Sequence, residues 1–265
     1  MNTILLIVVT FLWLVTLLVL IIKSKQCKTN VRYALDRRET ERKVNNELVH
    51  ITAHDLQEPL RKIQAFGDRI KSVNWQTLDE KSKDYLIYII NAASHMQELI
   101  DELLKFSKVA NKVIEPTAVD LNLVVKEVLE DFKDKVKNEK ATIVVEKLPV
   151  IIGDAWELRQ LFRFLLENAF KFRHPQRDPA IKIYDNSQGK QTVCIEDNGI
   201  GFDNKYADRI FQIFQRLHHK EMYEGTGMGL AICRKIMEQH GGKISARGVP
   251  DQGATFIITF PDPTP

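Results

Sequence analysis

The chain has few cysteines, and their spacing excludes two kinds of stabilisation. Cys27, Cys194 and Cys233 are scattered over 265 residues, and no CxxC pair occurs. A disulfide framework needs an even number of cysteines, and a structural zinc site needs closely spaced ligand pairs. We therefore expect neither, and we expect Cys194 and Cys233 to be buried, inert thiols.

The chain also lacks a concentration of positive charge. Its net charge is +3, and no region gathers lysine and arginine around aromatic residues. Nucleic-acid binding requires a basic surface of that kind, so we expect no nucleic-acid partner. Internal repeats and low-complexity tracts are missing as well, which excludes a solenoid. A chain of this length suits two or three globular modules.

A long apolar run occurs once, at the N-terminus. Ile4–Ile22 carries no charge, and its polar residues are Thr10 and Thr16. A helix of this length, at about 1.5 Å per residue, covers a hydrocarbon core of roughly 30 Å. A cleaved signal peptide is the alternative, but no basic residue precedes the run and no small-residue cleavage site follows it. We expect residues 1–23 to be a single-pass transmembrane anchor.

Basic residues follow this run closely. They are Lys23, Lys25, Lys28 and Arg32. Positive charge accumulates on the cytoplasmic side of membrane proteins, so the expected location is the cytoplasmic membrane with the remaining chain in the cytoplasm. Residues 24–47 are polar with sparse apolar positions, which predicts a linker helix.

Residues 48–112 have the apolar spacing of a helical hairpin. The first arm repeats apolar or small residues at three- and four-residue steps, at Leu56, Leu60, Ile63, Gly67 and Ile70. The second arm does so at Tyr85, Ile89, Ala92, Met96, Leu99 and Leu103. Each arm needs a partner for its stripe. A homodimeric four-helix bundle would bury both stripes, and a partner within the chain is the alternative.

His54 stands out in the first arm. It lies two positions before Leu56, and at about 100° per residue this turns it away from the apolar stripe, toward solvent. Asp55 is adjacent, and Pro59 frees a backbone carbonyl nearby. A lone helical histidine usually has a structural role, but these neighbours favour a chemical one.

Residues 116–262 alternate between helix and strand patterns. Glu115–Thr117 breaks the helical region and predicts a hinge. The expected helices are Leu121–Val136, Ala155–Phe172 and Met228–Gln239. The expected strands are Thr142–Glu146, Val150–Ile152, Ala180–Tyr184, Thr192–Glu196, Lys243–Ala246 and Thr255–Thr259. This order predicts a two-layer α/β sandwich with helices on one face of a mixed sheet.

Some polar residues have structural interpretations. Asp154 is placed to cap the helix that begins at Ala155, and Glu157 completes a capping box. The histidines at 218, 219 and 240 match no common metal-ligand spacing, so we expect surface or loop positions for them.

Three motifs together predict a Mg-nucleotide site. Asp197–Asp203 (DNGIGFD) follows a strand, and Glu224–Ile236 (EGTGMGLAICRKI) places three glycines before a helix. Glycines at a helix N-terminus let backbone N–H groups approach phosphate oxygens. In Glu167–Phe172 (ENAFKF), Asn168 and Lys171 share one helix face, an amide oxygen suited to Mg²⁺ and an ammonium suited to phosphate.

With these motifs in this order, the chain resembles membrane-anchored sensor histidine kinases of two-component systems. Its AHDLQEPLRKI segment is most similar to the phosphoacceptor region of phytochrome-type histidine kinases, and the likeness runs from about Val49 to Phe260. The resemblance implies a dimeric phosphoacceptor hairpin and an ATP-binding domain of the histidine kinase and Hsp90-like ATPase fold. It implies that ATP phosphorylates His54 and that the phosphoryl group passes to an aspartate in the receiver domain of a response regulator.

The resemblance also implies individual roles. Asp55 would orient His54 or act as its base, Asn168 would bind Mg²⁺ with help from Glu167, and Asp197 would bind the adenine amino group. The other implied ATP-binding residues are Lys171, Gly199, Gly201, Phe211, Phe214, Gly225, Thr226, Gly227, Gly229, Leu230 and Thr255.

Two positions depart from the family pattern. Phe164 replaces an asparagine that many relatives carry one turn before the metal ligand. Glu58 stands four residues after the histidine, where kinases that also dephosphorylate their partner often have threonine or asparagine. Two other functions stay open: a catalytically weak dimeric scaffold, and an ATPase of the same nucleotide-binding superfamily. With no sensory domain recognised, a membrane partner could provide the signal.

Overall fold

The structure is a computed structural model. It describes residues 23, 49, 51–112, 116–187, 190–217, 223 and 225–261. The expected anchor, apart from Lys23, and the expected linker helix lie outside this part of the chain. Within the described residues, no helix is both long enough and apolar enough to cross a bilayer.

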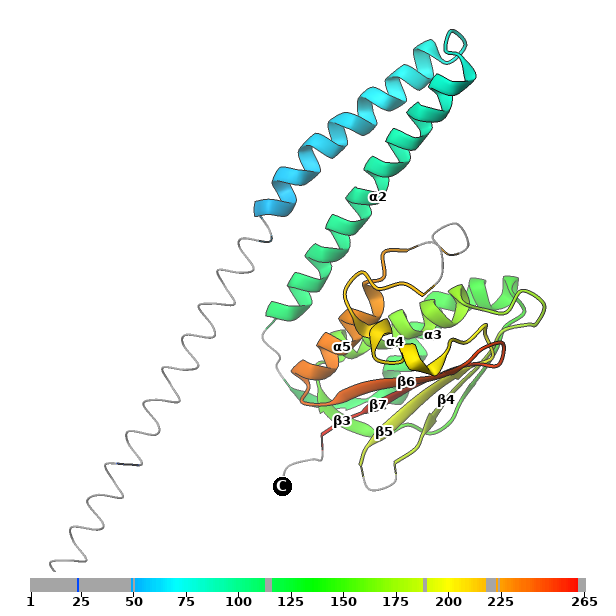
Figure 1. The fold of residues 1–265 in the computed structure, drawn as a ribbon. Helices are drawn as coiled ribbons and strands as arrows, with labels where there is room; N and C mark the ends of the chain where they lie inside the picture. The colour runs from blue at the N-terminus through cyan, green and yellow to red at the C-terminus, as the bar shows by residue number, and fades with distance from the viewer. Residues whose placement is uncertain are drawn as a thin grey trace, which may run out of the picture. The chain divides into compact units, whose positions relative to one another are not determined.

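Two long antiparallel helices form a hairpin (Figure 1). The first is described over residues 51–74, and the second is α2, Glu80–Asn111. The turn between them is closed by hydrogen bonds from the amides of Thr77 and Leu78 to the carbonyl of Asn74. Asp79 caps α2 because its carboxylate accepts from the Ser82 amide at 2.6 Å.

The seam inside the hairpin differs from the predicted stripe. The buried seam residues are Ala53, Leu60, Gly67, Leu86, Ala93 and Ile100. They repeat at seven-residue intervals, and several are small, so the two helices approach closely. By contrast, Leu56, Ile63 and Ile70 are 50%, 41% and 42% exposed. The predicted stripe of the first arm is confirmed at Leu60 and Gly67 and wrong at the other three positions, which leave an apolar face uncovered. None of the residues predicted for the second arm is in this seam.

The α/β domain contains seven strands, three α-helices and two short 3₁₀ helices within its described residues. Its helices are α3 (Leu121–Asn138), α4 (Ala155–Lys171), η1 (Asn204–Tyr206), η2 (Arg209–Phe211) and α5 (Gly229–Gln239). Its strands are β1 (Thr117–Asp120), β2 (Thr142–Val145), β3 (Val150–Gly153), β4 (Ala180–Asp185), β5 (Thr192–Asp197), β6 (Lys243–Val249) and β7 (Gly253–Thr259). The predicted elements are all present within two or three residues, and β1 is an addition.

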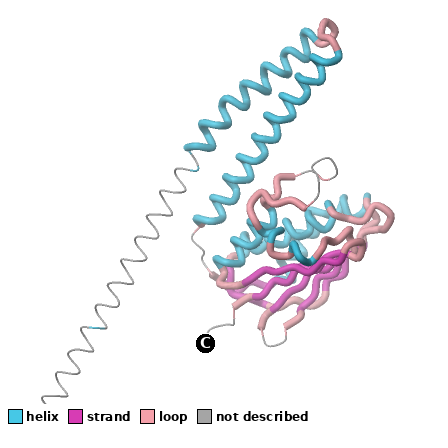
Figure 2. Tube along the Cα trace, viewed as in Figure 1, coloured by secondary structure: helices cyan, strands magenta, loops and turns pink. Residues whose placement is uncertain are grey.

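Five strands form a mixed sheet in the order β2-β4-β5-β7-β6, and β1 pairs with β3 in a separate ribbon. β2 and β4 are parallel and the other pairs of the sheet are antiparallel. The three α-helices cover one face of this sheet (Figures 1 and 2), as predicted. The architecture is a two-layer α/β sandwich.

The core fills the space between sheet and helices. α4 is central because Leu158, Leu161, Phe162 and Leu165 are fully buried on it. Phe170 stacks on Phe132 of α3 with ring centroids 5.7 Å apart. The thiols at 194 and 233 are buried as predicted, and burial raises the pKa of both.

The C-terminal end of α2 contacts the α/β domain through polar groups and through Val109, which is buried in the core of that domain. Lys112 Nζ lies 2.8 Å from both carboxylate oxygens of Asp154. Gln239 Nε2, at the end of α5, donates to the carbonyl of Val109 at 2.9 Å. The predicted hinge includes Thr117, but Thr117 begins β1 and pairs with Gly153. The hinge prediction is wrong at Thr117, and Glu115 lies outside the described residues.

Only one of the two hydrogen bonds of the predicted capping box at α4 is present among the described residues. Asp154 accepts from the Glu157 amide at 3.0 Å as predicted. The Glu157 side chain does not reach back: it is fully buried, and its carboxylate has no hydrogen-bond partner in the described part of the chain. The Asp154 amide, which Glu157 would bond in a capping box, instead donates to Nε2 of His240 at 3.0 Å. The His240 side chain is 1% exposed, so the predicted surface position is wrong.

Candidate nucleotide site and phosphoacceptor

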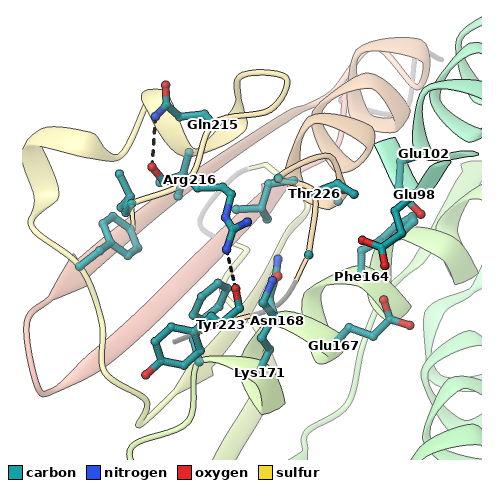
Figure 3. A pocket seen from close by; sticks show the side chains of 18 of the residues that line it. Glu98, Glu102, Phe164, Glu167, Asn168, Lys171, Gln215, Arg216, Tyr223 and Thr226 are labelled. Atoms are coloured by element: carbon teal, nitrogen blue, oxygen red, sulfur yellow. Dashed lines mark hydrogen bonds between the residues drawn. The ribbon is translucent and has the colours of Figure 1, made fainter. Parts of the chain in front are cut away.

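A cavity of about 1130 Å³ opens beside the N-terminus of α5 (Figure 3). Its walls come from α4, from the segment between β5 and α5, from β7 and from α2. From the α/β domain it is lined by Phe164, Glu167, Asn168, Lys171, Phe172, Asp197, Gly201, Phe202, Ile210, Gln215, Arg216, Leu217, Tyr223, Gly225, Thr226, Gly227, Gly229, Leu230, Ala254 and Phe256. Its volume is sufficient for a nucleotide.

Asp197 lies at one end of the cavity, at the end of β5. Its Oδ1 accepts from the Gly199 amide at 2.9 Å, and the Ala254 amide also donates to it. Burial raises the pKa of Asp197 to about 6, against the lowering effect of these two amides. A carboxylate held there by two backbone donors still has acceptor capacity for an exocyclic amino group of a ligand.

Glycines are required around Asp197. A β-carbon at Gly199 would lie 2.4 Å from the carbonyl oxygen of Phe172, and one at Gly201 would lie 2.0 Å from that of Val249. Gly201 also has φ of +59°. A side chain at either position would therefore push this wall of the cavity out of place.

The glycine segment before α5 forms the other end. Gly225 and Gly227 have φ of +120° and +79°, and no side chain caps the first turn of α5 in the described part of the chain. A β-carbon at Gly225 would lie 2.6 Å from Nζ of Lys171. The Lys171 ammonium therefore lies directly against this backbone. An ammonium beside exposed amides at a helix N-terminus suits phosphate groups.

Asn168 and Lys171 point into the cavity from α4 (Figure 3). Glu167 is beside them and is held by Arg163, whose Nε donates to it at 3.0 Å. The described residues contain no cluster of three histidine, cysteine or acidic side chains that could hold a metal. Asn168 and Glu167 fit Mg²⁺ that takes its remaining ligands from water and phosphate, as Mg²⁺ commonly does.

Phe164 lies one turn before Asn168 and lines the same wall. Its ring would lie 3.4 Å from a β-carbon at Gly229. The ring therefore packs against the start of α5, where it adds apolar contact but no ligand for a cation.

Several cavity residues, Arg216 and Tyr223 among them, were not predicted from the sequence. Arg216 Nη2 donates to the Tyr223 carbonyl at 2.5 Å, and the Tyr223 ring lies 5.1 Å from that of Phe172. Arginine and aromatic residues between motifs carry no distinctive spacing. The glycines that flank them are the one sequence signal that pointed to this region.

Four predicted ATP-binding residues do not line the cavity: Gly199, Phe211, Phe214 and Thr255. Phe211 is buried in the core, and Phe214 is 47% exposed with φ of +60°. Thr255 alternates with Ala254 and Phe256 along β7, and these two neighbours face the cavity. The fold places the Ala254 methyl group opposite Asp197, where the Thr255 hydroxyl was expected.

His54 and Asp55 lie outside the cavity, on the first helix of the hairpin. Their side chains are 77% and 74% exposed, and His54 Nδ1 lies 3.4 Å from Asp55 Oδ1. The outward direction of His54 agrees with the prediction. Glu58 forms a 2.6 Å ion pair with Lys62, which lowers the pKa of Glu58.

Two family descriptions match this arrangement. Residues 44–112 match the "His Kinase A (phospho-acceptor) domain", and residues 153–264 match the "Histidine kinase-, DNA gyrase B-, and HSP90-like ATPase" family. The second match begins at the end of β3. The preceding β1 and α3 share its core through the β1–β3 ribbon and the packing of α3 on α4.

Known proteins resemble the chain over most of its length. The phytochrome-like protein Cph1 of Synechocystis sp. is 38% identical over 81% of this chain and 29% of its own. Cyanobacterial phytochrome A of Nostoc sp. is 35% identical over 81% of this chain and 28% of its own. The chain thus spans less than a third of either relative.

One solved structure extends the likeness to the fold. It is the histidine kinase ThkA in complex with the response regulator protein TrrA, with a TM-score of 0.57 and 27% identity. The match covers 87% of this chain and 66% of the other.

Proposed function

We propose that this chain, which belongs to the histidine kinases by its two matched domains, phosphorylates His54 from Mg-ATP and passes the phosphoryl group to an aspartate of a response regulator. One observation carries the proposal. The same chain exposes His54 beside Asp55 and holds a nucleotide-sized cavity with Lys171 against the glycine segment. An ATPase of this superfamily has no use for such a histidine.

In the proposed reaction, Nε2 of His54 attacks the γ-phosphorus in line, and the bond from that phosphorus to the bridging oxygen breaks to release ADP. Asp55 faces Nδ1, so it holds the proton there and offsets the positive charge that develops on the ring. Lys171 offsets charge on the phosphates, and Asp197 selects adenine. Mg²⁺, bound with Asn168 and Glu167, would supply further charge neutralisation to the phosphates.

The second step transfers the phosphoryl group from the His54 nitrogen to a carboxylate oxygen of the receiver domain. The relative solved with a response regulator supports a partner of this class. The uncovered apolar face of the hairpin supports a homodimer, because Leu56, Ile63 and Ile70 would be buried in a four-helix bundle.

We further propose that Glu58 limits dephosphorylation of the partner. It is a carboxylate held by Lys62, and it lacks the neutral hydroxyl or amide with which threonine or asparagine could orient an attacking water. The test is decay of the phosphorylated partner with wild type and with Glu58→Thr; equal decay with both would remove this part of the proposal.

Membrane anchoring is also proposed. The support is the uncharged run Ile4–Ile22 followed by basic residues, which favours a single span with the kinase in the cytoplasm and a membrane partner as the source of signal. Membrane fractions washed with alkaline carbonate should retain the full chain and release a variant with Leu12→Lys and Val15→Lys.

The decisive experiment uses the full chain and ATP labelled at the γ-phosphate. Wild type should gain acid-labile, alkali-stable label, and His54→Gln should gain none while it still binds ADP. Folded wild type without label would refute the kinase function. That result would favour a dimeric scaffold, for which Phe164 is the supporting feature because it removes a metal ligand.

A further inference from the structure

Two polar contacts join the helices of the hairpin at matching intervals. Gln57 Nε2 donates to Asp101 Oδ1 at 2.8 Å, and Gln64 Nε2 donates to Ser94 Oγ at 3.3 Å. The glutamines are seven residues apart, and so are their partners. Seven residues are two helical turns, so both contacts lie on one face of the hairpin and define the same antiparallel register.

The apolar seam does not define this register by itself. Ala53, Gly67 and Ala93 are small buried members of it, and a β-carbon at Gly67 would lie 2.6 Å from Ile90. Small side chains allow close approach, but their contacts are non-directional. Polar residues placed beside an apolar helical seam specify which alignment is favoured.

Asp101 has a further contact that orients its carboxylate. Gln97, one turn earlier on α2, donates through Nε2 to the same Oδ1 at 3.1 Å. Both amides therefore converge on one oxygen. Asp101 and Ser94 also line the nucleotide cavity. One carboxylate is thus shared between the cavity wall on α2 and the helix that carries His54.

Gln57 lies three residues after His54, on the next turn of the same helix. A displacement of one residue along the helix would move His54 by about 1.5 Å. In-line attack requires reacting atoms within roughly 3 to 3.5 Å, and an error of 1 Å can lower a rate by about a hundredfold. The alignment of the two hairpin helices is therefore a condition for phosphorylation.

We propose that Asp101 is a positioning residue for the phosphorylation of His54. It fixes the first helix against α2 through Gln57, and it leaves nucleotide binding to the α/β domain. This inference rests on the proposed kinase function. It predicts that loss of the hydrogen bond affects the rate of phosphorylation at saturating ATP and not the affinity for nucleotide.

The test compares Asp101→Leu, which cannot accept a hydrogen bond, with Asp101→Asn, whose amide oxygen can. Gln57→Glu places a second carboxylate against Asp101, and its combination with Asp101→Asn restores the bond with donor and acceptor exchanged. For each full-length variant, the rate of phosphohistidine formation, the KM for ATP and the Kd for ADP are measured. Circular dichroism and light scattering check the helices and the oligomeric state.

For Asp101→Leu and Gln57→Glu we expect kcat to fall roughly tenfold. The KM and the ADP Kd of Gln57→Glu should stay within about twofold, because Gln57 does not line the cavity. Asp101→Asn and the double variant should recover most of kcat. An equal loss with Asp101→Leu and Asp101→Asn would overturn the inference, as would an ADP Kd of Gln57→Glu that rises in step with its loss of kcat. Wild type that forms no phosphohistidine would overturn the proposed function itself, and this inference with it.

Discussion

At the scale of single residues, the cavity depends on carboxylates whose burial sets their chemistry. Asp197 is the clearest case. Burial holds its pKa near 6, although two backbone amides counteract that shift. The same burial that favours contact with a ligand base brings the titration of Asp197 close to neutral pH.

Nucleotide binding should therefore depend on Asp197 and on pH. Hydrogen bonds to charged groups contribute about 1.5 to 3 kcal/mol, so Asp197→Asn should weaken ADP binding by roughly ten- to a hundredfold. In wild type, binding should weaken as pH falls through about 6, because the carboxylate is protonated. Calorimetric titration at pH 7.5 and 5.5 measures both effects.

Glu196 provides the matched control for this prediction. It is an exposed carboxylate on the preceding residue of β5, and its side chain is directed to the other face of the sheet. Glu196→Gln should bind ADP like wild type at pH 7.5. Because the charge of Glu196 adds to burial in raising the pKa of Asp197, its removal should shift the loss of binding to lower pH. Any pH dependence that comes from titration of ADP itself will appear in all three proteins. If Asp197→Asn loses affinity between pH 7.5 and 5.5 as strongly as wild type, Asp197 is not the group whose protonation weakens binding.

Glu157 should reduce stability at neutral and alkaline pH. Burial, and secondarily the charge of Asp154, raises its pKa to about 7, while Lys112 opposes this rise. When the pKa of a carboxyl is higher in the folded state than in the unfolded state, the free energy of unfolding falls as pH rises between the two pKa values. Glu157→Gln should raise the free energy of unfolding by about 1 to 3 kcal/mol at pH 8, and by less at pH 5.

Urea unfolding of the α/β domain at the two pH values measures this difference. Glu130→Gln on α3 is the control, because the Glu130 side chain is 68% exposed. An equal gain at pH 8 and pH 5 for Glu157→Gln would show that its effect comes from packing and not from the charge.

At the scale of secondary-structure elements, the hairpin divides its apolar residues between two surfaces. The seam within the chain consists of small and large residues at seven-residue intervals, and Leu56, Ile63 and Ile70 remain on the outside. On the second arm, Tyr85, Ile89 and Met96 are exposed as well, at 56%, 53% and 45%. Both arms thus present apolar surface for a second copy.

Charge on this outer face should dissociate the dimer. Ile63→Lys places two lysines in a two-fold interface, and burial of unpaired charge should weaken association by roughly a hundredfold or more. Sedimentation equilibrium measures the dimer constant. Leu123→Lys on α3 is the control, since Leu123 is 61% exposed and outside the hairpin. Equal dissociation by both variants, or by neither, would argue against this face.

The hairpin also illustrates what the sequence could predict. Apolar periodicity located both helices, but it could not decide which apolar residues face inward. Alanine and glycine at the seam give a weak hydropathy signal, whereas leucine and isoleucine give a strong one. Close helix approach favours the small residues, so Ala53 and Gly67 are buried and Leu56 is exposed.

The sequence likewise predicted only part of the cavity. Asn168, Lys171 and Asp197 lie in local motifs whose spacing has a direct chemical meaning, and the sequence predicted them. Arg216 and Tyr223 lie between η2 and α5, outside any recognisable motif. Thr255 was misplaced because a shift of one residue along a strand reverses the face of the sheet.

At the scale of the whole molecule, the proposed reaction must join two regions that are built separately. The hairpin holds the acceptor, and the α/β domain holds the donor. Near the end of α2 the described contacts between them combine polar and apolar groups: the Lys112–Asp154 ion pair, the bonds from Gln239, and Val109, which is buried in the core of the α/β domain. Polar contacts of this kind can break and reform at small net cost, because water replaces them.

Helix α5 has the glycine segment at its first turn and Gln239 at its last, so these two contacts belong to one helix of 11 residues, about 16 Å long. Nucleotide that orders the first turn should also order the last. Saturating ADP should therefore slow amide hydrogen exchange at residues 109–112, far from the bound phosphates, and Gln239→Leu should remove that protection without loss of ADP affinity. The molecule would then report an occupied nucleotide site to the base of the hairpin through the stiffness of a single helix.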